Sequence, residues 1–194
     1  MSSPERWRAA WRALRARAPA GLYRAVIERY REPHRHYHTL RHLEECLQRF
    51  DEVRPLAERP ADVELALWFH DAIYDARRED NEARSAAWAK ASVGGDSGER
   101  IAALIIATAH EALPQSSDAK LIVDIDLAIL GTEPARFAEY EAQVRQEYDF
   151  VPQAVYQRQR AELLHRLLAR PTIFNTPFFI ARYEAKARAN LAKR

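Results

Sequence analysis

The sequence contains little glycine, a single cysteine and no long apolar run. Cys46 is the only cysteine among 194 residues, which excludes an intrachain disulfide and a zinc site built from several cysteines. No stretch approaches the roughly 20 apolar residues that cross a bilayer. The most apolar run, 101–109, is typical of a buried helix, and the N-terminus lacks a signal-peptide pattern. We therefore expect a soluble, cytoplasmic protein without a membrane partner.

Neither sign of charge is in excess. The 30 Lys and Arg residues stand against 28 Asp and Glu residues, which gives a formal net charge of +2. Such a chain has no overall field that attracts a polyanion, so no nucleic-acid polymer is expected as a partner. Apolar residues make up 47% and charged residues 30%, as in ordinary folded domains.

Helix-forming residues dominate, and Pro, Gly and capping residues divide the chain. We expect an all-α fold: one compact helical bundle over residues 1–194 with about eight to nine helices. The expected helices include 20–31, 40–53, 61–74, 80–93, 98–110, 117–130 and 133–149.

Apolar and aromatic residues also predict which segments are buried. The helix near 61–74 is apolar nearly all round and should lie in the middle of the bundle. The stripe Trp7–Trp11 is expected to pack onto its own domain rather than bind a membrane or a partner helix. The aromatic segment 173–179 should close the core or line a pocket, with a homodimer contact as the alternative.

Two short stretches concentrate the histidines. His38 and His42 are four residues apart at the predicted start of a helix, so both lie on one side of it. His70 and Asp71 lie side by side in the most apolar predicted helix of the chain, 61–74. A buried carboxylate is costly unless it is paired or bound to metal. Either a hydrogen-bonded His–Asp pair or a divalent ion accounts for this second stretch.

Acids also interrupt the apolar helix near 117–130. Asp126 lies among Ile125, Leu127 and Ile129, and no Lys or Arg follows in the next turn. Together with His42, His70 and Asp71 it predicts one convergent site with imidazole and carboxylate ligands. Such a set suits Mn, Fe, Co, Ni or Zn, and also Mg. Asp124 is expected to orient another ligand, and His110 to point toward the same centre.

The order His42, His70–Asp71, Asp126 resembles the H…HD…D signature of the HD superfamily of metal-dependent phosphohydrolases, which are all-helical. The flanking residues 69–75, 80–86 and 126–131 look like an uncharacterised bacterial branch of predicted HD phosphohydrolases. The resemblance implies that His42, His70, Asp71 and Asp126 are the metal ligands. It covers roughly residues 20–190, with the metal-site core at about 20–131 and helical extensions at 1–19 and 132–194.

The string from Tyr37 to His42 is similar to a segment of cyclic nucleotide phosphodiesterases, members of the same broader superfamily. This likeness implies that His38 protonates the leaving oxygen. Thr39 stands where those enzymes have Asn, and no residue matches their substrate-gripping glutamine, which argues against a cyclic nucleotide substrate. One tightly held ion is expected. A second ion could use His110, but the sequence shows no further histidine that matches the position of a second ligand for it.

Further candidates flank these stretches. Arg35 and Arg41 are the nearest cations for a substrate phosphate, unless both are solvated surface residues. Asn81 and Glu82 follow the His–Asp pair and are candidates for contacts with substrate or water. Alternatively, Asp80 caps that helix while Glu82 complements its dipole.

These features predict hydrolysis of a phosphate ester or anhydride in a nucleotide or another small phosphorylated metabolite. A divalent ion activates the water, Asp71 bridges ion and water, and His38 donates a proton. Two alternatives remain: a non-enzymatic module that binds metal or nucleotide, and a di-iron oxygenase of the HD type.

Overall fold

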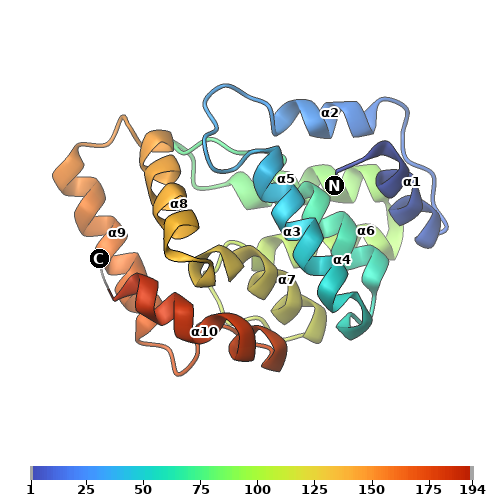
Figure 1. Ribbon diagram of the computed structural model, residues 1–194. Coiled ribbons are helices and arrows are strands. Elements are labelled where there is room, and N and C mark those ends of the chain that lie inside the picture. Colours follow the sequence, from blue (N-terminus) through green and yellow to red (C-terminus); the bar gives the residue numbers. More distant parts are fainter. Residues whose placement is uncertain (1, 193–194) are drawn as a thin grey trace. The chain divides into compact units, whose positions relative to one another are not determined.

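The computed structural model describes residues 2–192. These residues form ten α-helices and two short 3-10 helices, and no strand occurs among them (Figure 1). The predicted all-helical class is confirmed, with slightly more helices than expected. The elements are α1 (Pro4–Ala13), α2 (Leu22–Arg29), α3 (Leu40–Val53), η1 (Arg54–Leu56), α4 (Pro60–Phe69), α5 (Asn81–Val93), α6 (Gly95–Ala107), α7 (Ser117–Leu127), η2 (Ala128–Gly131), α8 (Pro134–Glu147), α9 (Gln153–Leu168) and α10 (Pro177–Leu191).

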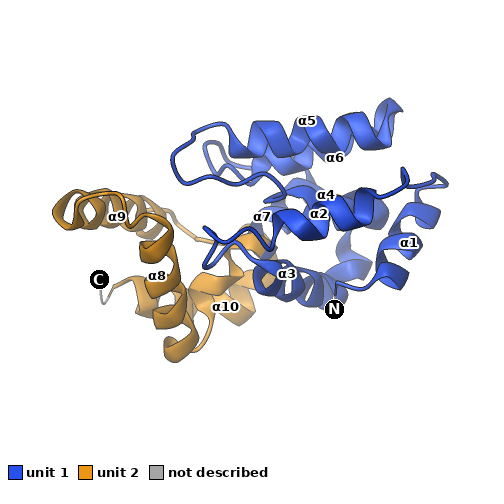
Figure 2. Ribbon diagram, turned by 90° about the horizontal axis from the view of Figure 1, so that it is seen from above, with its two compact units in different colours: residues 1–125 blue, residues 126–194 orange. Residues whose placement is uncertain are grey.

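The chain divides into two compact units, residues 1–125 and 126–194 (Figure 2). The first unit holds α1 to α6 and α7 up to residue 125. The second begins with the last two residues of α7 and holds η2 and α8 to α10. That the whole chain forms one domain stays a prediction.

Helix α4 is the central helix of the first unit. It contacts α1, α3, α5 and α6, and every residue from Asp62 to Phe69 is buried. Its Glu64 carboxylate is held by two arginines, with Arg6 Nε at 2.7 Å and Arg54 Nη2 at 2.6 Å. A buried carboxylate needs such partners to offset its lost hydration. The predicted central position of this helix is confirmed.

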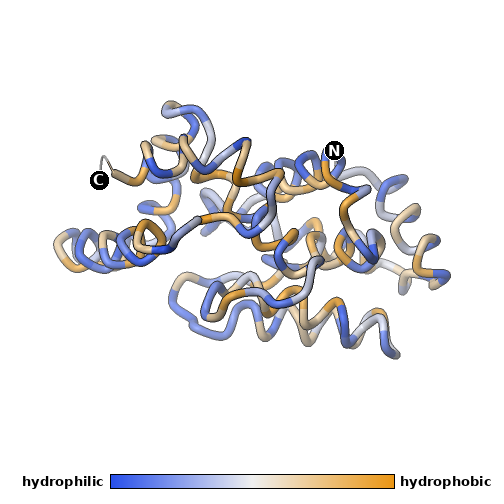
Figure 3. Tube along the Cα trace, turned by 90° about the horizontal axis from the view of Figure 1, so that it is seen from below, coloured by the Kyte–Doolittle hydropathy of each residue, from blue (hydrophilic) through white to orange (hydrophobic). Residues whose placement is uncertain are grey.

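Helix α1 packs onto its own unit, as predicted. Its Trp7 ring meets Trp68 of α4 edge to face at a centroid distance of 5.2 Å. Trp11 is also buried. In most other helices apolar and polar residues alternate along the chain, which Figure 3 shows as changes of colour along each helix. The buried apolar faces hold the unit together.

Helix α4 ends at Phe69, so the expectation of a helix to residue 74 is wrong. The Nδ1 atom of His70 lies 2.8 Å from Leu67 O, and this contact satisfies a carbonyl that has no partner within the helix. Residues 70–75 then form a turn, here called the His70 turn. Side chains of α5 hold its backbone: Ile73 N donates to Ser85 Oγ at 3.0 Å and Asp75 N to Asn81 Oδ1 at 3.0 Å. The sequence pattern of α4 alone contains no sign of these distant partners.

Helix α6 also stops earlier than predicted, at Ala107 rather than near residue 110. Thr108 Oγ1 donates to Ile105 O at 2.6 Å and takes up a carbonyl at the helix end. His110 follows with φ +57°, in the left-handed region that ends helices.

In the second unit η2 packs closely against α10. A Cβ atom on Gly131 would lie 2.6 Å from both Cβ and O of Tyr183, so only glycine fits there. Asn190 Nδ2 donates to Leu130 O at 2.9 Å and to Thr132 O at 3.0 Å. Phe174 and Phe179 are both buried, as expected for a segment that closes the core. Within residues 2–192 no helix combines the length and apolarity that a membrane crossing needs.

Candidate metal centre

Four side chains in the structure form a group that can hold a metal ion. His42 and Cys46 come from α3, His70 follows α4, and Asp126 lies in α7. One ligand atom from each lies within 4.8 Å of the others. His42, Cys46 and His70 are buried and Asp126 is partly exposed. The predicted convergence of His42, His70 and Asp126 is therefore observed, and Cys46 is an addition that sequence reasoning missed.

Asp71 is not one of these four residues, but its Oδ2 atom lies beside two of them. His42 Nε2 lies 3.0 Å from His70 Nε2, and Asp71 Oδ2 lies 3.2 Å and 3.1 Å from these two nitrogens. A divalent ion bound at about 2.0–2.2 Å to three such atoms on one octahedral face would hold them about 3 Å apart. The three separations match that spacing.

The buried Oδ2 atom of Asp71 makes no hydrogen bond within the described residues, although it lies close to two imidazole nitrogens. A buried carboxylate oxygen without a hydrogen bond is costly in a protein that holds no cation there. This oxygen is therefore a position that a metal ion fits.

The backbone sets the tautomer of His70. Because Leu67 O can only accept, the Nδ1 atom of His70 at 2.8 Å is the donor in that contact. In the neutral ring the lone pair is then on Nε2, which faces His42 and Asp71. A backbone carbonyl that orients a histidine in this way is a common outer partner of metal ligands.

The pKa values of His70 and Asp71 shift in opposite directions at this centre. Burial lowers the pKa of His70, but Asp71 together with Tyr30 and Cys46 raises it well above the ordinary histidine value. Burial raises the pKa of Asp71, yet the charges of His70 and His38 hold it well below its ordinary range. The site thus stabilises positive charge next to a carboxylate.

Cys46 lies one helical turn after His42, and its sulfur is buried against that ring. Sγ is 3.8 Å from His42 Nδ1 and 3.7 Å from Nε2. Burial raises the pKa of the thiol, but the charges of His42 and His70 lower it to about 7. The spacing of four residues from His42 is the sequence signal that could have indicated this position.

His38 lies beside the centre, partly exposed in the loop before α3. Its ring stacks on Tyr74 at a centroid distance of 4.0 Å and lies 5.8 Å from the His42 ring. Its charge also lowers the pKa of Asp71. His38 is therefore near the carboxylate but is not in the group of ligand atoms.

Arg35 and Asn81 both contact the backbone of the His70 turn. Arg35 is 5% exposed, unlike the solvated arginine that the sequence left open, and it donates to Asp71 O at 2.6 Å. Asn81 Nδ2 donates to Asp75 O at 3.0 Å. Both side chains thus support the turn that carries Asp71.

The remaining candidates lie elsewhere in the first unit. Arg41 is exposed and pairs with Glu45 at 3.3 Å, as in a solvated surface pair. Asp80 is the N-cap residue of α5, but its carboxylate binds Arg78 at 2.7 Å and caps no backbone group. Glu82, in the first turn of α5, is partly buried, and so is His110. Asp124 is fully buried in α7, two residues from Asp126 and therefore on another face of the helix.

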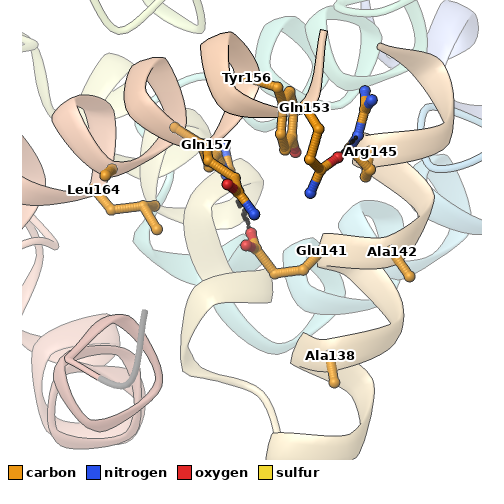
Figure 4. A pocket seen from close by; sticks show the side chains of 10 residues that line it. Ala138, Glu141, Ala142, Arg145, Gln153, Tyr156, Gln157 and Leu164 are labelled. Carbon is orange, nitrogen blue, oxygen red and sulfur yellow. Dashed lines mark hydrogen bonds and ion pairs between the residues drawn. The ribbon is translucent and has the colours of Figure 1, made fainter. Parts of the chain in front are cut away.

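The second unit has a pocket of about 620 Å³ between α8 and α9 (Figure 4). Its charged groups are already engaged: Arg160 pairs with Glu141, and Arg145 Nε donates to Gln153 at 2.8 Å. None of the side chains predicted to form the functional site lines this pocket.

Comparison with known protein families, with curated proteins and with solved structures gives no match for this chain.

Proposed function

We propose that this protein is a metal-dependent phosphohydrolase that acts on a small phosphorylated metabolite, such as a nucleotide. The observation that carries the proposal is the buried Oδ2 atom of Asp71, which lies 3.1–3.2 Å from two imidazole nitrogens and makes no hydrogen bond within the described part of the chain. His42, His70, Asp71 and Asp126 would hold the ion, which is the ligand set implied by the HD resemblance.

A bound divalent ion supplies an acidic water and neutralises phosphoryl charge. The protein's part is to place groups around that chemistry. Asp71 directs Oδ2 toward the imidazole nitrogens, which leaves its Oδ1 to accept a proton from the attacking water. The partial exposure of the Asp71 side chain, 13%, gives water and substrate access to this carboxylate.

His38 is suited to the second proton transfer, to the departing oxygen. It stacks on Tyr74, which fixes the ring plane, and stands outside the group of ligand atoms. A protonated imidazole can donate its proton to an alkoxide or phosphate leaving group. A group with this role must be near Asp71 without being bound to metal.

The experiment is a phosphate-release screen over nucleotides and sugar phosphates, each with Mn, Mg, Co, Ni or Zn. We expect Asp71→Asn to abolish turnover, because it removes the ligand charge with almost no change of shape. Asp96→Asn, at an exposed acid in the first turn of α6, is the matched control and should keep activity. Wild-type turnover in the Asp71 variant would overturn the proposal.

The same samples test the two alternatives that the sequence leaves open. Metal analysis that finds two irons per chain would favour the oxygenase. Tight metal binding without phosphate release from any substrate would favour a binding module. Absence of bindable metal would exclude all enzyme readings of this site.

A further inference from the structure

Arg35 is a buried cation that joins two segments of the candidate site. Its side chain is 0% exposed. Nη1 donates to His38 O at 3.1 Å and to Asp71 O at 2.6 Å, and Nη2 donates to Ala72 O at 3.2 Å. One guanidinium therefore bonds both the loop with the candidate acid and the turn with the candidate ligand.

The charge and plane of this guanidinium are also fixed. Glu32 Oε2 accepts from Nε at 3.1 Å and from Nη2 at 3.0 Å, so a carboxylate compensates the buried charge. The Tyr30 and Tyr74 rings lie 5.4 Å and 5.6 Å from the guanidinium carbon. This distance is in the range of cation–π contacts.

Both tyrosines also contact residues of the candidate site. Asp71 N donates to Tyr30 Oη at 3.3 Å, and the hydroxyl donates to Trp68 O at 3.3 Å. Tyr74 stacks on the His38 ring at 4.0 Å. We call Tyr30, Glu32, Arg35 and Tyr74 the Arg35 brace.

We propose that Arg35 is a positioning residue that sets the place of His38 relative to Asp71. Arg35 does not act as a ligand itself, because its guanidinium N–H groups point at carbonyls and at Glu32. A planar fork with five donors can bond three separate carbonyls at once, whereas the compact ammonium of lysine cannot reproduce that geometry. This inference rests on the proposed function.

The expected consequence is a loss of alignment rather than a loss of substrate binding. With Arg35 removed, the carbonyls of residues 38, 71 and 72 lose their common donor, and acid and ligand move independently. Errors of about 1 Å in such groups lower turnover by up to ~10²-fold. Loss of an outer partner of metal ligands lowers metal affinity by about 10- to 100-fold. KM should change little, because no substrate contact is removed.

The test compares wild type, Arg35→Ala and Arg35→Lys, with Arg24→Ala as the matched control. Arg24 is exposed and pairs with Glu28 on the same helix. Mn²⁺ and Zn²⁺ affinities are measured by calorimetry, and kcat and KM with bis(p-nitrophenyl) phosphate. We expect both Arg35 variants to lose at least about tenfold in kcat and in metal affinity, with the control unchanged.

Chemical rescue separates positioning from general stability. The Arg35→Ala variant leaves a space near the Tyr30 and Tyr74 rings and beside Glu32 that a guanidinium ion fits. Millimolar guanidinium, far below its denaturing range, should restore a large part of kcat and metal affinity, whereas equal concentrations of sodium or tetramethylammonium should not. Arg35→Lys should show no such rescue, because its own side chain fills the space.

The outcomes are distinct for the two proposals. If wild type binds metal but hydrolyses nothing, the proposed function fails, while metal affinity and its rescue still test the brace. If folded Arg35 variants keep wild-type kcat and affinity, the brace proposal is wrong and the proposed function stands. If both Arg35 variants are unfolded by circular dichroism even with guanidinium present, Arg35 serves fold stability and the positioning role is overturned.

Discussion

The Nε2 atoms of His42 and His70 lie 3.0 Å apart, in two side chains that are each 1% exposed. Two protonated nitrogens at this separation would repel one another, so either one proton or one metal ion lies between them. Asp71 Oδ2 completes a triangle with these atoms and carries the opposite charge. Protons and a metal ion should therefore compete for the same place.

Metal affinity is expected to rise with pH. Burial lowers the pKa of His70, but Asp71, Tyr30 and Cys46 together raise it well above its ordinary value, so this proton is retained at higher pH than on a free histidine. An ion must displace the proton, which weakens binding as the pH falls through the raised pKa. Calorimetry of Zn²⁺ binding in buffers of different protonation enthalpy measures the released proton. A constant affinity between about pH 6 and 8, with no proton release, would contradict this expectation.

Cys46 is expected to lie near a bound metal ion without coordinating it. Its sulfur is 3.8 Å and 3.7 Å from the two nitrogens of His42, so it lies beside the middle of the ring, whereas the Nε2 lone pair points away from the ring. The cobalt-loaded protein should therefore lack a sulfur-to-cobalt charge-transfer band. Cys46→Ala should keep its metal stoichiometry. A charge-transfer band that disappears in the Cys46→Ala variant would instead make the thiolate a ligand and favour zinc, iron or cobalt over magnesium.

The sequence predicts the helical class, the central position of α4 and the convergence of His42, His70 and Asp126, because each follows from apolar periodicity and from acids set within it. It does not predict the end of α4. The His70 turn is fixed by Arg35, Ser85 and other residues far away in the chain. Local patterns contain no information on such long-range hydrogen bonds.

Arg35 and Cys46 are two residues of the site whose surroundings the sequence analysis did not predict. An arginine among polar loop residues suggests a solvated cation or a phosphate contact, and only the fold shows that it is buried against carbonyls. Cys46 was informative in the sequence only through the absence of a second cysteine. Its contact with His42 depends on the helical register of α3, which the spacing of four residues would have indicated.

His38→Gln is expected to lower turnover while metal content stays unchanged. The side chain stacks on Tyr74 and lies outside the group of ligand atoms, so its loss removes a proton donor and leaves His42, His70 and Asp126 in place. General acid catalysis contributes about 10²- to 10⁴-fold to rate. Metal analysis and kcat on the same preparation test this, and His36→Gln, at an exposed position in the same loop, is the control. Loss of metal from the His38 variant would make this residue a ligand.

Gly131→Ala should destabilise the second unit. A Cβ atom there would lie 2.6 Å from both Cβ and O of Tyr183, and one of these belongs to the backbone of α10, which cannot rotate away. Asn190 holds α10 to the neighbouring carbonyls of Leu130 and Thr132, so the helix cannot move off without losing hydrogen bonds. Overpacking of this kind costs about 1–3 kcal/mol.

Chemical denaturation of the Gly131 variant measures this cost as a lower midpoint. Glu133→Ala, two residues later, is the matched control: its carboxylate is 72% exposed and pairs with Lys186 at the surface. A surface pair of this kind contributes about 0–1 kcal/mol, so the control should remain close to wild type. If both variants unfold at the wild-type midpoint, α10 tolerates a side chain at residue 131, and the close approach of η2 to α10 contributes little to the stability of this unit.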